Sequence, residues 1–106
     1  MRMEEEAVLL VSENTKDKDG FPVSAATEIP IFVREKSAVR TEFYEALRAG
    51  VRVKTVLETR QEDWEQSAHL VSGKKEYASQ IWYDGAVYDI VRTYKNEKSM
   101  VEIICS

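Results

Sequence analysis

The stretch that decides the fold is Gln80-Ile-Trp-Tyr-Asp-Gly-Ala-Val-Tyr-Asp-Ile-Val-Arg-Thr-Tyr94, followed by Lys95-Asn-Glu-Lys-Ser99 and Met100-Val-Glu-Ile-Ile-Cys105. Two runs of β-branched and aromatic residues flank Asp84-Gly85, a dipeptide that favours the positive φ angles of a type I′ turn. A two-residue turn there predicts the cross-strand pairs Tyr83–Ala86, Trp82–Val87 and Ile81–Tyr88. The polar run Lys95–Ser99 allows a second reversal. The sequence therefore predicts a three-stranded antiparallel meander over residues 80–105.

The predicted meander is apolar on both faces. One face carries Ile81, Tyr83, Ala86, Tyr88 and Ile90, and the other carries Trp82, Val87 and Val91. An antiparallel sheet with one face in water normally alternates apolar and polar residues. We therefore expect the rest of a barrel to cover one face, and a helix or a neighbouring subunit to cover the other.

Length and composition indicate one globular domain that spans residues 1–106. The chain is 43% hydrophobic and 32% charged, with a formal net charge of −4, which is a globular and not a disordered composition. An acidic chain is a poor candidate for a stand-alone nucleic-acid binder, because such proteins usually carry a basic patch. The acidity does not exclude DNA passing nearby, since a wall that must not grip DNA is better acidic than basic.

The ends of the chain and its apolar runs point to the cytoplasm. The acidic start Met-Arg-Met-Glu-Glu-Glu lacks the apolar core of a signal peptide. No apolar run approaches the roughly 20 residues that span a bilayer. The single cysteine, Cys105, excludes an intramolecular disulfide.

The remaining segments complete a small barrel. Short apolar or alternating runs predict strands over Ala7–Val11, Glu28–Lys36 and Val51–Trp64, and a helix over Ser37–Gly50. The charged runs Glu13–Gly20 and Gln61–Lys75 are predicted loops. The predicted fold class is thus mainly β (α+β): a small antiparallel β-barrel of about six strands, with one short helix inserted between strands two and three.

Finer patterns predict the orientation of these elements. Pro30 indicates an edge or the start of a strand, because proline cannot donate to a ladder. Ser37 or Thr41 suits the start of the helix and Gly50 its left-handed end. An apolar stripe of Val39, Phe43, Ala46 and Leu47, with Tyr44 beside it, is expected to plug the barrel or cover a sheet face. In the third strand Val51, Val53, Thr55, Leu57 and Thr59 alternate with Arg52, Lys54, Glu58 and Arg60, which predicts one wet face.

Few residues suggest chemistry. His69 is the only histidine and has no second histidine or cysteine near it. Glu62, Asp63 and Glu65 surround Trp64 but lie where a strand fades into a loop, which favours a solvated acidic patch over acid–base work. Cys105 lacks a visible basic partner, so we expect a small buried hydrophobe.

Two motifs fail on their spacing. The segment Asp17-Lys-Asp19-Gly20 resembles the start of a calcium loop whose twelfth position is Glu28, but the alternate ligands and central glycine do not fall in place. The run Gly73-Lys74-Lys75 lacks the first glycine and the Ser/Thr of a phosphate loop and is predicted to be a basic loop tip. We expect a non-enzyme with no catalytic, cofactor-binding or metal-binding residues.

Arg92 is the one charge predicted on a mostly apolar face, beside Tyr88, Ile90 and Tyr94. Such a charge is usually paired with a carboxylate or stacked on an aromatic ring. A carboxylate partner at the edge of the core is the favoured interpretation.

The order of motifs resembles a known family. Phe-Val-Arg-Glu-Lys precedes the helix Ser37–Ala46 with its Glu-Phe-Tyr segment, and Gly50–Trp64 follows. The chain then carries a Tyr-x-Gly-x-x-Tyr hairpin, an Arg-x-Tyr strand end (Tyr83–Tyr94) and a final Val-Glu-Ile-Ile-Cys run. This order is similar to that of the head–tail joining proteins (head-closure or stopper proteins and head–tail adaptors) of long-tailed phages and prophages. The segment Gln61–Gln80 departs from it in being longer and more polar.

The resemblance implies a structural connector of the virion. It implies a ring that assembles beneath the portal and its adaptor and above the tail-completion protein, around double-stranded DNA that passes without sequence-specific binding. A loop would help to close the DNA channel, either within Ser37–Val53 or within the Gln61–Lys75 arm. It implies no membrane and no cofactor, with the chain in the host cytoplasm during assembly.

Two other functions remain open from the sequence. A small barrel could bind nucleic acid or another protein, with Trp64, Trp82 and the tyrosines as stacking platforms. A small enzyme or host-directed effector would need Glu62, Asp63, Glu65 and His69 to converge.

Overall fold

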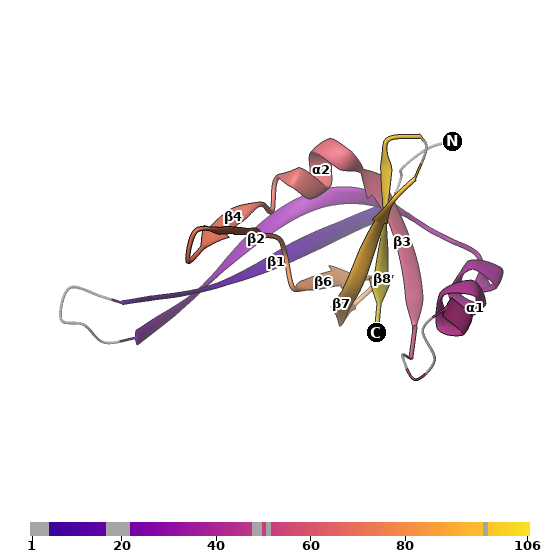
Figure 1. The fold of residues 1–106 in the computed structure, drawn as a ribbon, viewed down its shortest axis with the longest axis horizontal. Coiled ribbons are helices and arrows are strands. Elements are labelled where there is room, and N and C mark those ends of the chain that lie inside the picture. The colour runs from indigo at the N-terminus through magenta and orange to yellow at the C-terminus, as the bar shows by residue number, and fades with distance from the viewer. Residues whose placement is uncertain (1–4, 17–21, 48–49, 51, 97) are drawn as a thin grey trace.

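The computed structural model describes residues 5–16, 22–47, 50, 52–96 and 98–106, and it shows a closed antiparallel β-barrel (Figure 1). The strands follow the order β1-β2-β3-β8-β7-β6 around the barrel. They are β1 (Glu5–Lys16), β2 (Pro22–Glu35), β3 (Thr55–Arg60), β6 (Gln80–Tyr83), β7 (Ala86–Lys95) and β8 (Met100–Cys105). The mainly β fold and the six-stranded barrel predicted from the sequence are confirmed.

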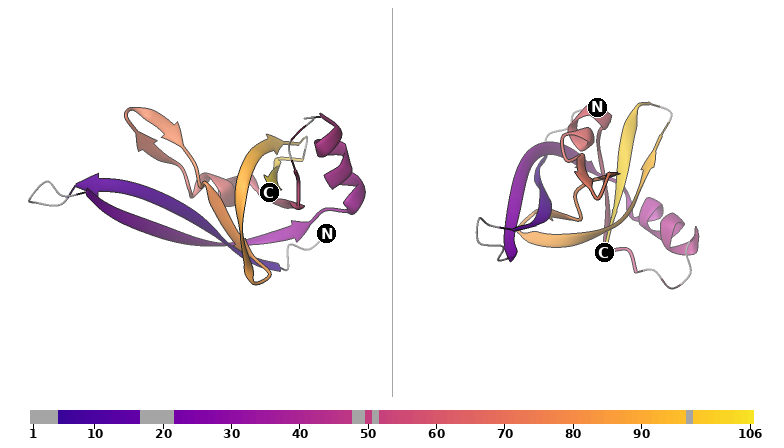
Figure 2. Two further views of the ribbon diagram at one scale, coloured as in Figure 1. Left: turned by 90° about the horizontal axis from the view of Figure 1, so that it is seen from below. Right: turned by 60° about the vertical axis from the view of Figure 1, so that its left-hand side comes forward.

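Three further features attach to the barrel. Helix α1 (Ala38–Leu47) joins β2 to β3, as predicted. A second short helix, α2 (Gln61–Glu65), and a small hairpin of β4 (His69–Val71) and β5 (Lys74–Glu76) lie between β3 and β6. Figure 2 shows α1 on one side of the barrel and the β4–β5 hairpin projecting separately.

The closing meander forms as its residues predict. The ladder between β6 and β7 pairs Tyr83 with Ala86 and continues in the predicted register. Asp84 and Gly85 have φ angles of 49° and 80°, the left-handed values that a type I′ turn requires. Along β6, Ile81 is buried while Trp82 is exposed. The two faces of this hairpin are therefore the ones that the sequence predicts.

A bulge in β7 corrects the predicted face of Arg92. Ile90 pairs with Cys105, but the next pair in the ladder is Arg92 with Ile104, so Val91 is the extra residue. A bulge of this kind reverses the alternation of the strand beyond it. Ile90 consequently packs on the barrel core, whereas Arg92 lies on the outer side with Ile104. The prediction that Ile90 and Arg92 share a face is wrong.

The first two strands are longer than predicted. The β1–β2 ladder runs from Glu5 opposite Val33 to Lys16 opposite Pro22, whereas β1 pairs with β6 only from Ala7 to Leu10. The outer part is thus a two-stranded ribbon that extends away from the barrel (Figures 1 and 2). The predicted loop at Glu13–Gly20 is strand as far as Lys16, and its remainder lies outside the described residues.

The prediction for Pro30 agrees with the ladders. Within the described residues β2 pairs with β3 only through Arg34 and Glu35. Pro30 pairs with Val8 of β1 and lies in the part of β2 that has no such partner on its other side. A proline is tolerated at such an edge position.

The predicted strand Val51–Trp64 is too long, and the predicted loop Gln61–Lys75 is largely ordered structure. β3 covers only Thr55–Arg60, and α2 follows at once. Trp64 of α2 is 5% exposed and stacks on Tyr77, with ring centroids 5.4 Å apart. Ser67 is buried and donates to the carbonyl of Trp64 while accepting from the Ala78 N–H. The buried ring of Trp64 packs the polar segment Gln61–Lys75 against the barrel core.

The barrel interior is one continuous apolar core. Its buried residues are Ala7, Leu9, Val11, Ile31, Val33, Leu57, Trp64, Ala78, Ile81, Tyr83, Val101, Ile103 and Cys105. A second, smaller cluster lies under α1 on the outer side of β3 and β8, formed by Tyr44, Val53, Val56 and Ile104. The barrel wall is therefore covered by α1 on one side only. No helix within the described part of the chain is long and apolar enough to cross a membrane.

Candidate functional site

The predicted acidic group does not converge on a shared point. Glu62 is exposed, and Asp63 accepts a hydrogen bond from Gln66. Glu65 forms an ion pair with Lys75 at 3.1 Å and accepts from the hydroxyl of Tyr77. The hydrogen bond from Lys75 lowers the pKa of Glu65 and raises that of Lys75. Asp63 and Glu65 thus have different neighbours, and the pair of Glu65 with Lys75 anchors α2 to β5.

His69 and the basic loop tip have structural surroundings. The Nδ1 atom of the half-buried His69 lies 2.9 Å from the carbonyl oxygen of Ser67, to which it can donate. Ser72 and Gly73 form the turn of the β4–β5 hairpin, with φ angles of 51° and 80°. Lys74 is exposed just after it. The prediction of a basic tip is confirmed.

Cys105 is fully buried, with an exposed fraction of 0%. Burial raises the pKa of its thiol to about 12. A thiol held in its neutral form is a poor nucleophile, and the prediction of a small buried hydrophobe is confirmed.

Arg92 stacks on an aromatic ring and does not form the ion pair with a carboxylate that the sequence analysis favoured. Its guanidinium carbon lies 5.0 Å from the ring centroid of Tyr94, within the range of a cation–π contact. Among the described residues, the ion pairs that involve arginine are those of Arg34 and Arg40. The predicted carboxylate partner of Arg92 is therefore replaced by an aromatic one.

Of the named residues in the calcium-loop candidate, the structure describes only the last one, Glu28. Asp17, Asp19 and Gly20 lie outside the described residues. Glu28 is an exposed strand residue that pairs with Leu10 of β1. Across the residues that the structure describes, no three histidine, cysteine or acidic side chains are grouped as metal ligands would be.

The outer wall of β2, β1, β6 and β7 carries an apolar row. Val8 pairs with Pro30 on one side and with Trp82 on the other, and Trp82 pairs with Val87. Cross-strand neighbours lie on the same face of a sheet, so these four side chains form one continuous stripe. Trp82 is 39% exposed and Val87 54% exposed. This exposed apolar row is a candidate contact surface.

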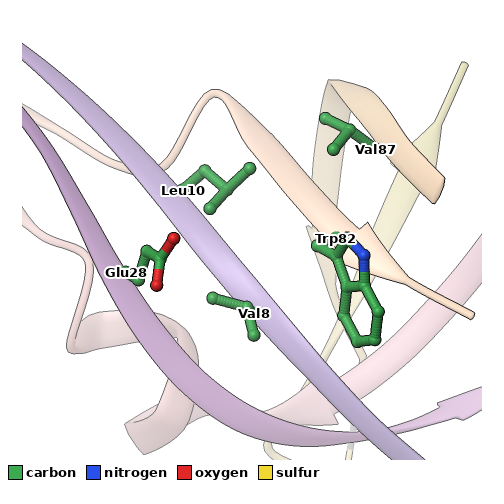
Figure 3. Close-up of a pocket in the computed structure, with 5 residues that line it drawn as sticks. All are labelled: Val8, Leu10, Glu28, Trp82 and Val87. Atoms are coloured by element: carbon green, nitrogen blue, oxygen red, sulfur yellow. The ribbon is translucent and has the colours of Figure 1, made fainter. Parts of the chain in front are cut away.

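Three residues of the stripe, Val8, Trp82 and Val87, also line an open hollow of about 380 Å³ (Figure 3). Val8 and Leu10 line it from β1, and Trp82 and Val87 line it from the hairpin. Among the described residues that line it, Glu28 of β2 is the charged one. The hollow is thus an apolar surface with one carboxylate at its margin. We call it the β1–β6 hollow.

Helix α1 faces the barrel with Tyr44 and not with the predicted residues Val39 and Phe43. Val39 is 74% exposed and Phe43 50% exposed, and Ala46 is exposed as well. Tyr44 is the buried residue, at 8% exposure, and stacks on Tyr94 with ring centroids 5.1 Å apart. Val39, Phe43 and Ala46 of the predicted stripe therefore face outward, the side chain of Leu47 lies outside the described residues, and α1 covers β3 and β8 instead of the Trp82 face. We call Val39 and Phe43 the α1 ridge.

Polar contacts hold α1 in this orientation. Arg40 forms an ion pair with Glu102 of β8 at 3.2 Å. The hydroxyl of Tyr44 donates to the same carboxylate at 3.2 Å, and Glu45 accepts from the Val53 N–H at 3.1 Å. Charge-assisted bonds are stronger than neutral ones, and together they offset the cost of leaving the apolar ridge in water.

Of the residues predicted on the wet face of the third strand, Arg52, Lys54 and Arg60 are exposed, but Glu58 is buried under charged partners. Glu58 is only 4% exposed. It pairs with Arg34 and with Lys36 at 3.5 Å, and it accepts from the amide of Asn96 at 2.9 Å. Within β3 the strand alternates as predicted, with Leu57 in the barrel core and Glu58 on the outer side, and solvent is excluded from Glu58 by these side chains. Val53, which was predicted on the face of Leu57, packs instead in the outer cluster with Val56.

One end of the barrel interior is closed by a tyrosine between two carboxylates. The hydroxyl of Tyr83 lies within hydrogen-bond distance of Glu5 and of Glu35, and Thr55 donates to Glu35 at 3.1 Å. Burial, reinforced by these carboxylates, raises the pKa of Tyr83. A neutral hydroxyl is what this acidic surrounding requires, because a phenolate there would face two negative groups.

Sequence reasoning missed the hollow and the buried glutamates. The row Val8–Trp82–Val87 was detectable only in part, since the pairing of β1 with β6 joins segments far apart in the chain. In the sequence, Glu58 and Glu102 have the pattern of solvent-exposed polar residues in alternating strands. Their burial depends on cations supplied by β2 and α1, which no local pattern reveals.

No family model, curated protein or solved structure matches this chain. The functional argument therefore rests on the surfaces described above and on the motif order in the sequence.

Proposed function

We propose that this protein is a structural connector of a phage or prophage virion, which joins the portal and adaptor proteins of the DNA-filled head to the tail and helps to close the DNA channel. The observation that carries the proposal is the apolar stripe on the outside of the barrel. A small barrel that keeps Trp82 and Val87 on its surface is suited to burying them against a neighbouring protein. The motif order that resembles head–tail joining proteins supports the same assignment.

The shape of the chain also suits a connector. The β1–β2 ribbon and the β4–β5 hairpin extend from the barrel as separate arms (Figure 2), and the principal extents are 51 × 32 × 28 Å. Arms of this kind can reach the portal or adaptor on one side and the tail-completion protein on the other. In this proposal the protein resides in the virion and passes through the host cytoplasm during assembly.

The net charge of −4 supports a channel that DNA passes without being held. Like charge on the wall and on the phosphates prevents tight binding. The segments Ser37–Val53 and Gln61–Lys75 are the proposed contributors to channel closure. In the structure, the first contains α1 and the second contains α2 and the β4–β5 turn.

The nucleic-acid alternative is weakened by the position of the tryptophans. Trp64 is buried against Tyr77, so its ring offers no free stacking face of the kind that bases use. Trp82 is partly exposed, but Glu28 lines the same hollow. Single-strand binding that weakens steeply with salt would favour this alternative over the connector.

Co-sedimentation tests the connector function. The purified protein is expected to sediment with portal–adaptor rings and with DNA-filled heads, and heads assembled without it are expected to lose DNA and to accept no tails. Heads that retain DNA and accept tails in its absence would contradict the proposal.

A further inference from the structure

The barrel is closed between β2 and β3 by a shorter ladder than between any other two strands. Within the described residues β2 pairs with β3 only through Arg34 and Glu35, whereas every other neighbouring pair in the closed order shares at least four residue pairs. One further backbone bond crosses here, from the N–H of Lys36 to the carbonyl of Val56 at 2.8 Å. We call this junction the β2–β3 seam. Local opening starts where few contacts hold a fold together, which makes the seam the first candidate.

Side chains carry much of the β2–β3 seam. Arg34 and Lys36 both pair with Glu58 of β3. The hydroxyl of Thr59 donates to the carbonyl of Phe32 at 2.9 Å, beyond the last pair of the ladder. The two strands therefore separate past Arg34, and side-chain bonds take the place of the backbone ladder.

Helix α2 packs where the two strands separate (Figure 1). It contacts β2, β3 and β8. Its Trp64 lies in the barrel core and is 5% exposed. A buried aromatic ring supplies a large apolar contact area, so Trp64 acts as a plug at the open end of the seam.

One short segment holds this plug in place. We call residues 75–77, at the end of β5, the strap. Lys75 pairs with Glu65 at 3.1 Å, and the hydroxyl of Tyr77 donates to the same carboxylate at 3.2 Å. The ring of Tyr77 stacks on that of Trp64, with centroids 5.4 Å apart. The strap therefore couples the β4–β5 hairpin to the position of Trp64.

We propose that the barrel opens at the β2–β3 seam when Trp64 leaves it, and that the strap keeps the seam closed. The other five ladders persist in the open state, so the barrel becomes an open sheet in the order β2-β1-β6-β7-β8-β3. Because the strap is continuous with the β4–β5 hairpin, a partner that displaces this hairpin also opens the barrel. The inference goes beyond the connector function and does not depend on it.

Two amides that flank β3 report the opening. The N–H of Lys36 bonds to Val56 across the seam, and the N–H of Lys54 bonds to Cys105 of β8, both at 2.8 Å. Hydrogen exchange of the whole chain is followed by NMR and corrected for the intrinsic rate of each amide. Lys36 is expected to exchange at least about tenfold faster than Lys54. Its exchange should also depend less on urea, because the open state exposes less surface than the unfolded chain.

Tyr77→Ala tests the strap, and Tyr88→Ala is its matched control. Both tyrosines are partly buried against the same core, but Tyr88 lies on β7, which adjoins neither β2 nor β3. Tyr77→Ala should speed exchange at Lys36 at least about tenfold, because the open state has already lost its contact with Trp64. Tyr88→Ala should leave exchange at Lys36 within about threefold of the parent, because the β6–β7 ladder persists in the open state. Circular dichroism checks that both variants fold.

A milder variant keeps the test decisive if Tyr77→Ala fails to fold. The side chain of Lys75 is 57% exposed, so Lys75→Met is expected to fold while losing the ion pair with Glu65. It should speed exchange at Lys36 severalfold, as loss of a surface ion pair allows. Lys74→Met, at an exposed position of the same hairpin, is the control and should leave that rate unchanged.

Two results would overturn the proposal. One is exchange at Lys36 that is as slow as at Lys54 in the parent, which would mean that the barrel opens only as a whole. The other is a rate at Lys36 that responds no more to Tyr77→Ala than to Tyr88→Ala, or no more to Lys75→Met than to Lys74→Met. That result would mean that the strap does not control the seam. Either result leaves the connector function standing, because that function is judged by DNA retention and tail attachment.

Discussion

Glu58 of β3 and Glu102 of β8 are direct cross-strand neighbours, and each is only 4% exposed. Two like charges placed opposite each other in a sheet destabilise it unless cations compensate. Arg34 and Lys36 supply the compensation at Glu58, and Arg40 supplies it at Glu102. This outer wall of the barrel therefore carries buried charges and is covered by α1, whereas no helix of the described residues packs on the apolar row of the opposite wall.

Removal of Glu58 is expected to destabilise the fold. Glu58→Ala leaves Arg34 and Lys36 beside each other without their carboxylate, and breaking a buried pair typically costs about 3 kcal/mol. Urea unfolding should show a loss of about this size in the free energy of unfolding. Glu62→Ala, at an exposed carboxylate of α2, is the control and should stay within about 0.5 kcal/mol of the parent. Equal losses in both variants would contradict the compensation described here.

The orientation of α1 predicts a large loss of stability at Tyr44 and almost none at Val39. Tyr44→Ala removes the stacking on Tyr94 and the bond to Glu102, and loss of such a packed ring costs about 3 kcal/mol. Val39→Ala alters a residue that is 74% exposed and should change stability by less than about 0.5 kcal/mol. Chemical denaturation of both variants measures the difference. The reverse ranking would mean that the apolar stripe, and not Tyr44, faces the barrel.

Tyr44 also predicts a loss of stability at alkaline pH. Burial and the neighbouring Glu102 raise its pKa from 10.0 to about 12. Because the folded state favours the neutral phenol, its contribution is fully present below pH 10.0 and is lost as the pH rises toward 12. The ultraviolet difference titration between the parent and Tyr44→Phe should show a phenolate midpoint near 12. A midpoint near 10.0 would place this hydroxyl in water.

Local sequence patterns predicted where the strands and helix α1 lie better than they predicted which side chains of these elements are buried. Asp84-Gly85 and the flanking apolar runs predicted the closing hairpin, because turn chemistry and alternation are encoded within a few residues. The orientation of α1 was predicted wrongly, since Val39 and Phe43 form as regular a stripe as Arg40 and Tyr44. The choice between the two stripes depends on Glu102, almost sixty residues away, whose carboxylate binds Arg40 and Tyr44.

Irregularities in the strands explain the other differences. The bulge at Val91 moves Arg92 and Tyr94 to the outer wall, and strict alternation cannot show it. Trp64 lies in a polar stretch, so its burial against Tyr77 was not apparent. The hollow requires β1 to pair with β6, a long-range contact that barrel closure determines.

The turn at Gly85 is expected to contribute to stability through its backbone alone. Its φ angle is 80°, and a Cβ added there would meet nothing within 4 Å. Gly85→Ala should therefore lower the free energy of unfolding by about 1 kcal/mol, the conformational cost of a left-handed residue with a side chain. Asp84→Asn is the matched control at the adjacent turn position, where asparagine is equally suited to a type I′ turn. Thermal unfolding of the two variants should show a lower midpoint only for Gly85→Ala, and an unchanged midpoint there would mean that the hairpin closes through a different turn.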